Sequence, residues 1–207
     1  MLAGLGSALA LIYRSYYVTG SHLAYVQPVP FSHQHHAGEL GIDCRYCHTS
    51  VETAAFAGIP STEICMNCHQ QIWVGSPVLA PVRDSYRTGD SIPWQRVHKL
   101  PGFTYFDHSI HVAKGVGCVE CHGQVDKMPL TWQTRSLLME WCVDCHRHPT
   151  DRLRPADQVF SMTWQVQEEM DPETSRPHSR ASLGRQLTQE YGIRDATVLT
   201  SCSMCHR

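Results

Sequence analysis

The stretch Phe106-Asp-His108-Ser-Ile-His111, followed after a short spacer by Cys118-Val-Glu-Cys121-His122, decides what this chain is built around. Two cysteines separated by two residues and followed directly by a histidine form the attachment signature of c-type haem. The motif histidine is then the proximal iron ligand, and the two upstream histidines are candidates for the other axial face. An earlier stretch repeats the arrangement, with Phe31-Ser-His33-Gln-His35-His36 preceding Cys44-Arg-Tyr-Cys47-His48.

All ten cysteines of the 207-residue chain belong to such motifs. Zinc ribbons and disulfide scaffolds also use many cysteines, but neither requires a histidine directly after every second one. We therefore predict five covalently bound c-type haems. Their thioether cysteines are Cys44, Cys47, Cys65, Cys68, Cys118, Cys121, Cys142, Cys145, Cys202 and Cys205, and their proximal histidines are His48, His69, His122, His146 and His206.

Composition sets the fold class. About 41 residues are available for each haem, too few for an ordinary hydrophobic core around each one. We therefore expect a mainly α-helical and irregular multihaem cytochrome c, with short helices and long loops wrapped round five haems that supply much of the apolar interior. The formal net charge of −2 argues against nucleic acid as a partner.

The N-terminus predicts a membrane helix. Residues 1–13 are apolar and uncharged, and Arg14 follows within a tyrosine cluster typical of a membrane interface. A full span needs about 20 residues, so we expect a partial anchor over residues 1–19 that contacts lipid, and a haem domain over residues 20–207. Small residues at Ala3, Gly4, Ser7 and Ala8 favour packing against other membrane helices. A signal peptide is the alternative, although no basic segment precedes the apolar run.

Local patterns predict further elements. We expect helices over residues 137–146, 158–170 and 179–191, since these segments show helical spacing and end at turn signals. Residues 75–103 contain several prolines and are expected to form mostly loop.

Distal ligands come from the remaining histidines and methionines. The repeated Phe-x-His-x-x-His pattern nominates His33, His36, His108 and His111. For the fifth iron we expect His98, which has apolar neighbours in the loop region. Met139 and Met128 are the alternatives, because thioether ligation also occurs in c-type cytochromes. The other histidines, interpreted as non-ligands, are His22, His35, His148 and His178.

Longer blocks carry a family resemblance. Residues 27–60, 92–123 and 137–149 resemble the pentahaem cytochrome c subunit of bacterial alternative complex III, a quinol-oxidising membrane complex. The paired distal histidines are similar to the class III, cytochrome c3-like arrangement. A related cytochrome occurs in quinone reductase complexes of sulfate reducers. The resemblance implies an N-terminal anchor, a periplasmic haem domain at the bacterial cytoplasmic membrane, and three kinds of partner: an iron–sulfur subunit, multi-span quinol-site subunits and a monohaem cytochrome c.

The expected function is electron transfer in a respiratory or photosynthetic complex, from quinol oxidation to a downstream periplasmic acceptor. No catalytic residue is needed, because the redox cofactors carry the chemistry. A multihaem enzyme such as a nitrite reductase would need an iron with an open axial site, whereas all five motifs end in histidine and distal candidates are plentiful. A single-anchor multihaem quinol dehydrogenase is a further alternative.

Overall fold

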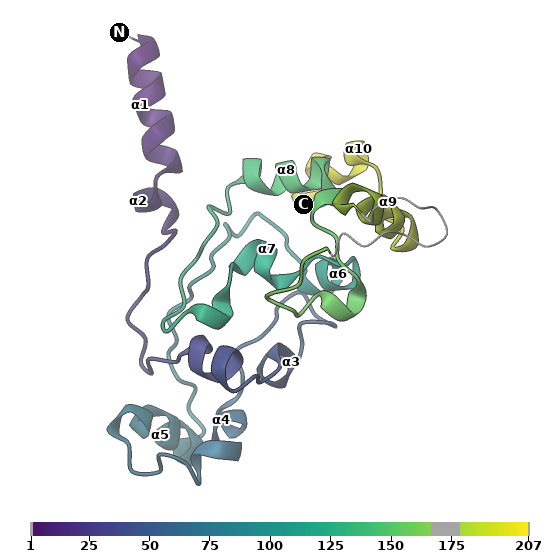
Figure 1. Cartoon of the computed structure of the whole chain (residues 1–207). Helices are drawn as coiled ribbons and strands as arrows, with labels where there is room; N and C mark the ends of the chain where they lie inside the picture. The colour runs from purple at the N-terminus through teal and green to yellow at the C-terminus, as the bar shows by residue number, and fades with distance from the viewer. Residues whose placement is uncertain (1, 167–178, 207) are drawn as a thin grey trace.

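The computed structural model describes residues 2–166 and 179–206. Within these ranges the chain forms short helices joined by long irregular segments, with two isolated β-bridges and no β-strand (Figure 1). Eight hydrophobic residues are buried in the described part. The expectation of a helical and irregular fold with little conventional core is therefore confirmed.

The helices follow one another in chain order. They are α1 (Leu2–Arg14), α2 (Tyr16–Thr19), η1 (Gln34–Glu39, a π-helix), α3 (Cys44–Cys47), α4 (Thr62–His69), η2 (Pro77–Leu79), α5 (Ala80–Thr88), α6 (His108–Ala113), α7 (Cys118–His122), η3 (Val125–Lys127), α8 (Met139–Arg147), η4 (Pro149–Asp151), η5 (Ala156–Gln158), α9 (Arg180–Glu190), α10 (Ala196–Leu199) and α11 (Cys202–Cys205).

Every haem motif lies on a helical turn. The five motifs occupy α3, α4, α7, α8 and α11. Residues three apart on a helix share a face, so both cysteines of a motif point to the same side. The α3 turn begins with an N-capping side chain: the Asp43 carboxylate accepts a hydrogen bond from the backbone N–H of Arg45.

A buried hydrophobic cluster lies at the end of the molecule far from α1 (Figure 1). Val29, Leu79 and Val82 form it, and Cys65 and Trp94 pack against it. This cluster joins α5 to the haem-motif helix α4, and the Thr62 and Ser85 hydroxyls are hydrogen-bonded at 2.6 Å beside it. The far end is therefore held by a small protein core of its own.

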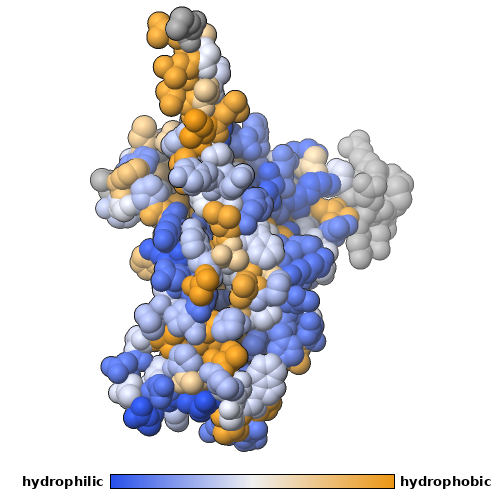
Figure 2. Space-filling model, turned by 90° about the vertical axis from the view of Figure 1, so that its left-hand side faces the viewer, coloured by the Kyte–Doolittle hydropathy of each residue, from blue (hydrophilic) through white to orange (hydrophobic). Residues whose placement is uncertain are grey.

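Helix α1 projects away from the rest of the chain (Figure 1), and its surface is largely apolar (Figure 2). Its first residue, Leu2, is 86% exposed. At its other end Arg14 makes two hydrogen bonds of 2.8 and 2.6 Å to Glu140 of α8. In the described part of the chain, no helix has both the length and the apolar character needed to cross a membrane. The partial membrane anchor expected over residues 1–19 is therefore not supported.

The other local predictions had mixed outcomes. Helices α8 and α9 confirm the expected helices over residues 137–146 and 179–191. Residues 75–103 are mostly loop, as expected, although η2 and α5 lie within them. The expected helix over residues 158–170 was wrong for residues 159–166, where the Ser161 hydroxyl accepts from the backbone N–H of Trp164 and favours a turn. Residues 167–170 lie outside the described residues.

Candidate haem-binding sites

Two segments of the chain share one internal geometry. We call residues 31–69 the first module and residues 106–146 the second module. In the first, the ring of Phe31 stacks on His36 at 4.4 Å and meets His33 edge-on at 4.9 Å. In the second, the corresponding distances from Phe106 are 4.5 Å to His111 and 4.8 Å to His108. The repeat seen in sequence is thus also a repeat in space.

Each of these upstream histidines faces a motif histidine. The centroid distances are 6.4 Å for His33–His48, 6.2 Å for His36–His69, 6.3 Å for His108–His122 and 6.2 Å for His111–His146. Within both modules, the first histidine faces the next motif along the chain, and the second histidine faces the motif after that.

This spacing fits two imidazoles on one iron. A metal–imidazole bond of about 2.0 Å, with the ring centre about 1.2 Å beyond the nitrogen, separates two coaxial rings by about 6.4 Å. Ordinary aromatic pairs span about 4.5–7 Å, but nothing in aromatic packing requires four separate pairs to agree so closely. Among residues 2–166 and 179–206, no cluster of three or more His, Cys, Asp or Glu side chains could hold a metal ion. Two nitrogens suffice for haem, because the porphyrin supplies the other four ligands.

Hydrogen bonds point the correct ring nitrogen at each candidate iron. A carbonyl oxygen can only accept, so a histidine Nδ1 bonded to one must carry the proton and leave the Nε2 lone pair free. Such bonds join His36 to Ser32, His48 to Gly58, His69 to Ile72, His108 to Ala55, His111 to Asp107, His146 to Leu199 and His206 to Phe103. The Nδ1 of His33 instead lies 2.8 Å from the Thr131 hydroxyl. Partners of this kind orient metal-ligating imidazoles.

Burial keeps several of these imidazoles neutral. It lowers the pKa of His33 to about 4 and that of His122 to about 3, and neighbouring histidines add to both effects. Burial also lowers the pKa of His111. A neutral imidazole presents a lone pair at physiological pH, so these rings can bind iron without first losing a proton.

All ten cysteines are free, as thioether formation with five haems requires. Burial is the largest cause of the raised thiol pKa values, about 11 for Cys118 and about 12 for Cys121, and neighbouring thiols contribute next. Thiols that affect one another in this way lie near each other, so they show which motifs are neighbours. The neighbouring thiols from different motifs are Cys47 and Cys65, Cys118 and Cys44, Cys121 and Cys145, and Cys142 and Cys205.

The sites therefore follow one another in space in an order that departs from chain order. Numbering the sites 1–5 along the sequence, the thiol neighbours give the spatial order 5, 4, 3, 1, 2. Figure 1 shows the corresponding helices α8, α7, α3 and α4 descending from the end near α1 to the far end. This order begins at site 5, beside the helix that Arg14 contacts, and ends at site 2, beside α5.

Site 5 lacks a matching distal histidine among the described residues. His206 lies beside the Phe103 ring, at 5.8 Å. His98 instead lies 4.4 Å from His122, too close for an iron between them, and its Nε2 is buried without a hydrogen-bond partner among the described residues. Its loop does reach site 5, since the backbone N–H of Tyr105 donates to the Cys205 carbonyl. The alternative ligand Met139 is 66% exposed at the start of α8. The assignment of His98 stays a prediction.

The remaining candidates behave differently from the paired histidines. Met128 is buried at 2% exposure, as expected for a packing residue. His35 is exposed and lies 2.9 Å from Glu39, so its contacts are those of a surface side chain. His178 lies outside the described residues. Sequence reasoning nominated the paired histidines but could not tell which motif each one faces.

Comparison with known proteins gives a partial relative. The chain is 34% identical over 97 residues to the multiheme cytochrome c subunit of menaquinone reductase from Nitratidesulfovibrio vulgaris. The match covers 46% of this chain and 45% of the relative, so it spans less than half of each protein. No family model matches the chain. Together with the geometry of the sites, this similarity supports a multihaem cytochrome c.

Proposed function

We propose that this chain is an electron-transfer subunit of a quinone-linked membrane complex, and that it holds five c-type haems in a row. The observation that carries the proposal is the set of four histidine pairs, each spaced for two axial ligands on one iron. A linear order of sites with two distinct ends suits conduction between two partners better than catalysis at one centre.

The role of the protein is to bind and orient. Bound haem iron would supply one-electron chemistry by alternating between its ferric and ferrous forms. The motif cysteines would fix each porphyrin edge, and the hydrogen-bonded Nδ1 atoms would hold the axial rings in place. At site 5 we propose His98 as the distal ligand, with Met139 as the alternative.

The quinone partner is proposed from similarity. The relative is named as a menaquinone reductase subunit, and the long sequence blocks resemble the pentahaem subunit of alternative complex III. We propose a place at the periplasmic side of the bacterial cytoplasmic membrane, with an iron–sulfur subunit, multi-span quinone-site subunits and a monohaem cytochrome c as neighbours. The two complexes differ in direction: electrons leave quinol in one and reach quinone in the other.

Two measurements on the purified complex test this proposal. A pyridine haemochrome assay should give five haems for each chain, and EPR of the oxidised protein should show all of them low-spin. Rapid mixing with a menaquinol analogue should then reduce these haems. A count of four or fewer in fully matured protein, or haems in equilibrium with neither quinol nor quinone, would overturn it.

A further inference from the structure

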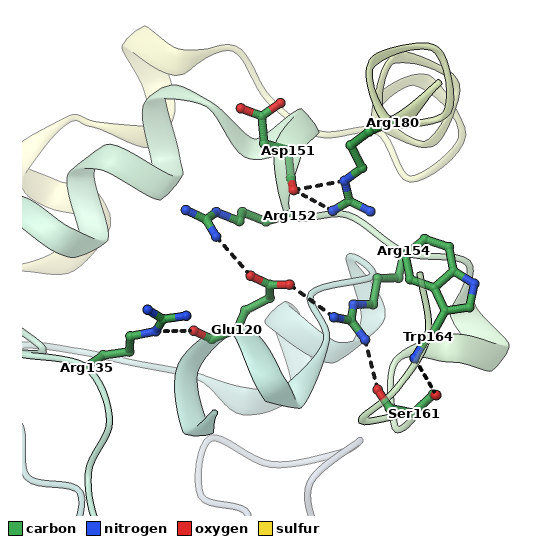
Figure 3. A network of polar contacts seen from close by, with 8 residues as sticks. All are labelled: Glu120, Arg135, Asp151, Arg152, Arg154, Ser161, Trp164 and Arg180. Carbon is green, nitrogen blue, oxygen red and sulfur yellow. Dashed lines mark hydrogen bonds and ion pairs between the residues drawn. The ribbon is translucent and has the colours of Figure 1, made fainter. Parts of the chain in front are cut away.

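Glu120 lies between the two cysteines of site 3 and holds two arginines from another segment (Figure 3). Its carboxylate accepts hydrogen bonds from Arg152 and Arg154, both at 3.1 Å. Both arginines lie in the short segment that follows the site 4 motif on α8. One carboxylate of the site 3 motif is therefore bonded to the chain that leaves site 4.

The contact is enclosed on the Arg154 side. The side chain of Glu120 is 16% exposed and that of Arg154 is 7% exposed. Gly117, directly before the site 3 motif, leaves room for the guanidinium, since a Cβ there would lie 2.5 Å from Arg154 Nε. Any side chain at position 117 would therefore displace Arg154.

Backbone contacts hold the same two segments together. The N–H of Arg154 donates to the Gly115 carbonyl at 2.8 Å, and Val116 forms an antiparallel bridge with Leu153. Leu153 is 1% exposed and Val116 is partly buried, so this bridge is largely shielded from water. The ion pairs therefore extend an interface that already joins the two motifs.

Further arginines surround the carboxylate. Arg135 donates from Nε to the Glu120 carbonyl at 3.0 Å, and Arg180 of α9 donates to the Asp151 carbonyl (Figure 3). The guanidinium groups of Arg154 and Arg180 both lie against the Trp164 ring. Glu120 is thus the anion at the centre of a mainly cationic cluster.

Glu120 points away from the haem side of its own motif. Cys118 and Cys121 share one face of α7, and the residue two positions after the first cysteine lies on the other side. On the distal side, His108 and His111 on the single helix α6 face sites 3 and 4. The two sites are therefore joined by α6 on one side and by the Glu120 contacts on the other.

The first module joins its motifs differently. There the equivalent motif positions hold Tyr46 and Asn67, and Asn67 Nδ2 donates to the Tyr46 hydroxyl at 3.0 Å. In the second module the equivalent of Glu120 in the site 4 motif is Asp144, which is exposed. Asp144 therefore offers a matched control with the same motif position and charge.

We propose that Glu120 is a positioning residue that sets the separation of haem sites 3 and 4, by anchoring the segment after the site 4 motif to the back of the site 3 motif. This proposal rests on the proposed function, in which neighbouring haems exchange electrons. Arg152 and Arg154 are its partners in that role.

The test uses the haem-loaded full chain in its complex, with the variants Glu120→Gln and Arg154→Gln. Glu120→Gln removes both ion pairs and Arg154→Gln removes the more buried one, and the two substitutions change the local charge in opposite directions. If the contact sets the separation, the magnetic coupling between sites 3 and 4 in EPR decreases in both variants. If Glu120 only tunes electrostatics, the coupling stays unchanged and the potentials rise in Glu120→Gln and fall in Arg154→Gln; that outcome overturns the proposal.

Two control variants distinguish this result from a general disturbance of the fold. Asp144→Asn should leave the coupling between sites 3 and 4 as in wild type, and Tyr46→Phe should affect only sites 1 and 2. If Glu120→Gln fails to mature, Glu120→Asp keeps the charge with a shorter reach, and unchanged coupling in that variant also refutes the proposal. Haem content and reduction of the wild type by quinol test the proposed function separately.

Discussion

The two modules agree on the distal side of their haem sites and differ on the proximal side. The distances from Phe31 and Phe106 to their two histidines match within 0.1 Å. Behind the motifs, however, the first module uses one neutral hydrogen bond, Asn67 to Tyr46, and the second uses a carboxylate held by arginines. If these histidines bind iron, coordination would constrain the distal geometry, whereas the contact on the opposite side of the motifs would be free to vary.

The modules also differ in how their second histidine is presented. His36 lies in the π-helix η1 and its ring is rotated 60° from that of His69, whereas His111 lies on α6 and is rotated 24° from His146. Helix η1 packs against η3 of the second module, and a Cβ at Gly38 would lie 2.2 Å from the Asp126 carbonyl oxygen. The first module is therefore shaped by close contact with the second.

The largest expected effect comes from removing the second histidine of each module. His36→Ala should convert site 2 to high spin and His111→Ala should convert site 4, each about one-fifth of total haem, because an iron without its distal nitrogen becomes five-coordinate. Low-temperature EPR measures the fraction. Since twisted axial rings give the most anisotropic low-spin signals, His36→Ala should also remove the signal with the largest g value.

His35→Ala is the matched control, since His35 is the direct neighbour of His36 and is bonded to Glu39 at the surface. It should keep all haems low-spin. A high-spin signal in this control, or loss of the site 1 signal in His36→Ala, would contradict the pairing described for the first module.

Much of this distal arrangement could be predicted from sequence. A phenylalanine two residues before a histidine pair, repeated ahead of two motifs, is a local pattern that needs no long-range information. Which motif each histidine faces could not be predicted, because His36 and His69 meet only through the fold. The spatial order of the sites, 5, 4, 3, 1, 2, was hidden for the same reason.

The proximal contacts gave almost no sequence signal. Glu120 occupies a variable position of the haem motif, and its partners lie in an irregular segment, so nothing local marks them as a pair. Helix α5 was missed because Pro81 within it and the prolines around it suggest a loop, although proline in the first turn of a helix is favourable.

The next effect concerns site 5, which lies outside both modules. If His98 is its ligand, His98→Ala should produce a high-spin fraction near one-fifth of total haem. The buried Nε2, which has no hydrogen-bond partner in the described part of the chain, is the motivation, although the ring must move away from His122 to reach site 5. If Met139 ligates instead, Met139→Ala should remove a thioether-linked near-infrared band and lower one potential. Five low-spin haems in His98→Ala would exclude His98.

A smaller effect is expected from the phenylalanines that pack on the distal rings. Phe31→Leu and Phe106→Leu should each destabilise the haem-loaded protein by about 1 kcal/mol, since a stacked aromatic pair contributes about 0.5–1.5 kcal/mol beyond its buried area. Denaturant unfolding followed at the Soret band measures the loss. Phe56→Leu, at a site 69% exposed, should change stability by less than about 0.5 kcal/mol. If the two substitutions lowered the free energy of unfolding by clearly unequal amounts, the stacked phenylalanine would not contribute equally to stability in the two modules.

The smallest predicted effect concerns one hydrogen bond that differs between the two modules. His33 has the Thr131 hydroxyl as its Nδ1 partner, whereas the equivalent His108 has the backbone carbonyl of Ala55, each at 2.8 Å. A side-chain substitution can therefore remove the bond only in the first module. If iron binds Nε2, the Nδ1–H of His33 would donate to the hydroxyl and would make the ring a stronger electron donor to the metal.

Thr131→Val keeps the shape of the side chain but removes the acceptor. A less basic axial ring stabilises the ferric iron less, so the potential of site 1 should rise while that of site 3 stays constant. The lost hydrogen bond should also reduce stability by about 0.5 kcal/mol, less than either phenylalanine substitution. Thr131→Ser, which keeps the hydroxyl, should retain the wild-type potential in a redox titration followed by EPR. An equal shift in Thr131→Ser would assign the effect to packing of the threonine methyl group, and a shift at site 3 would place Thr131 beside the wrong haem.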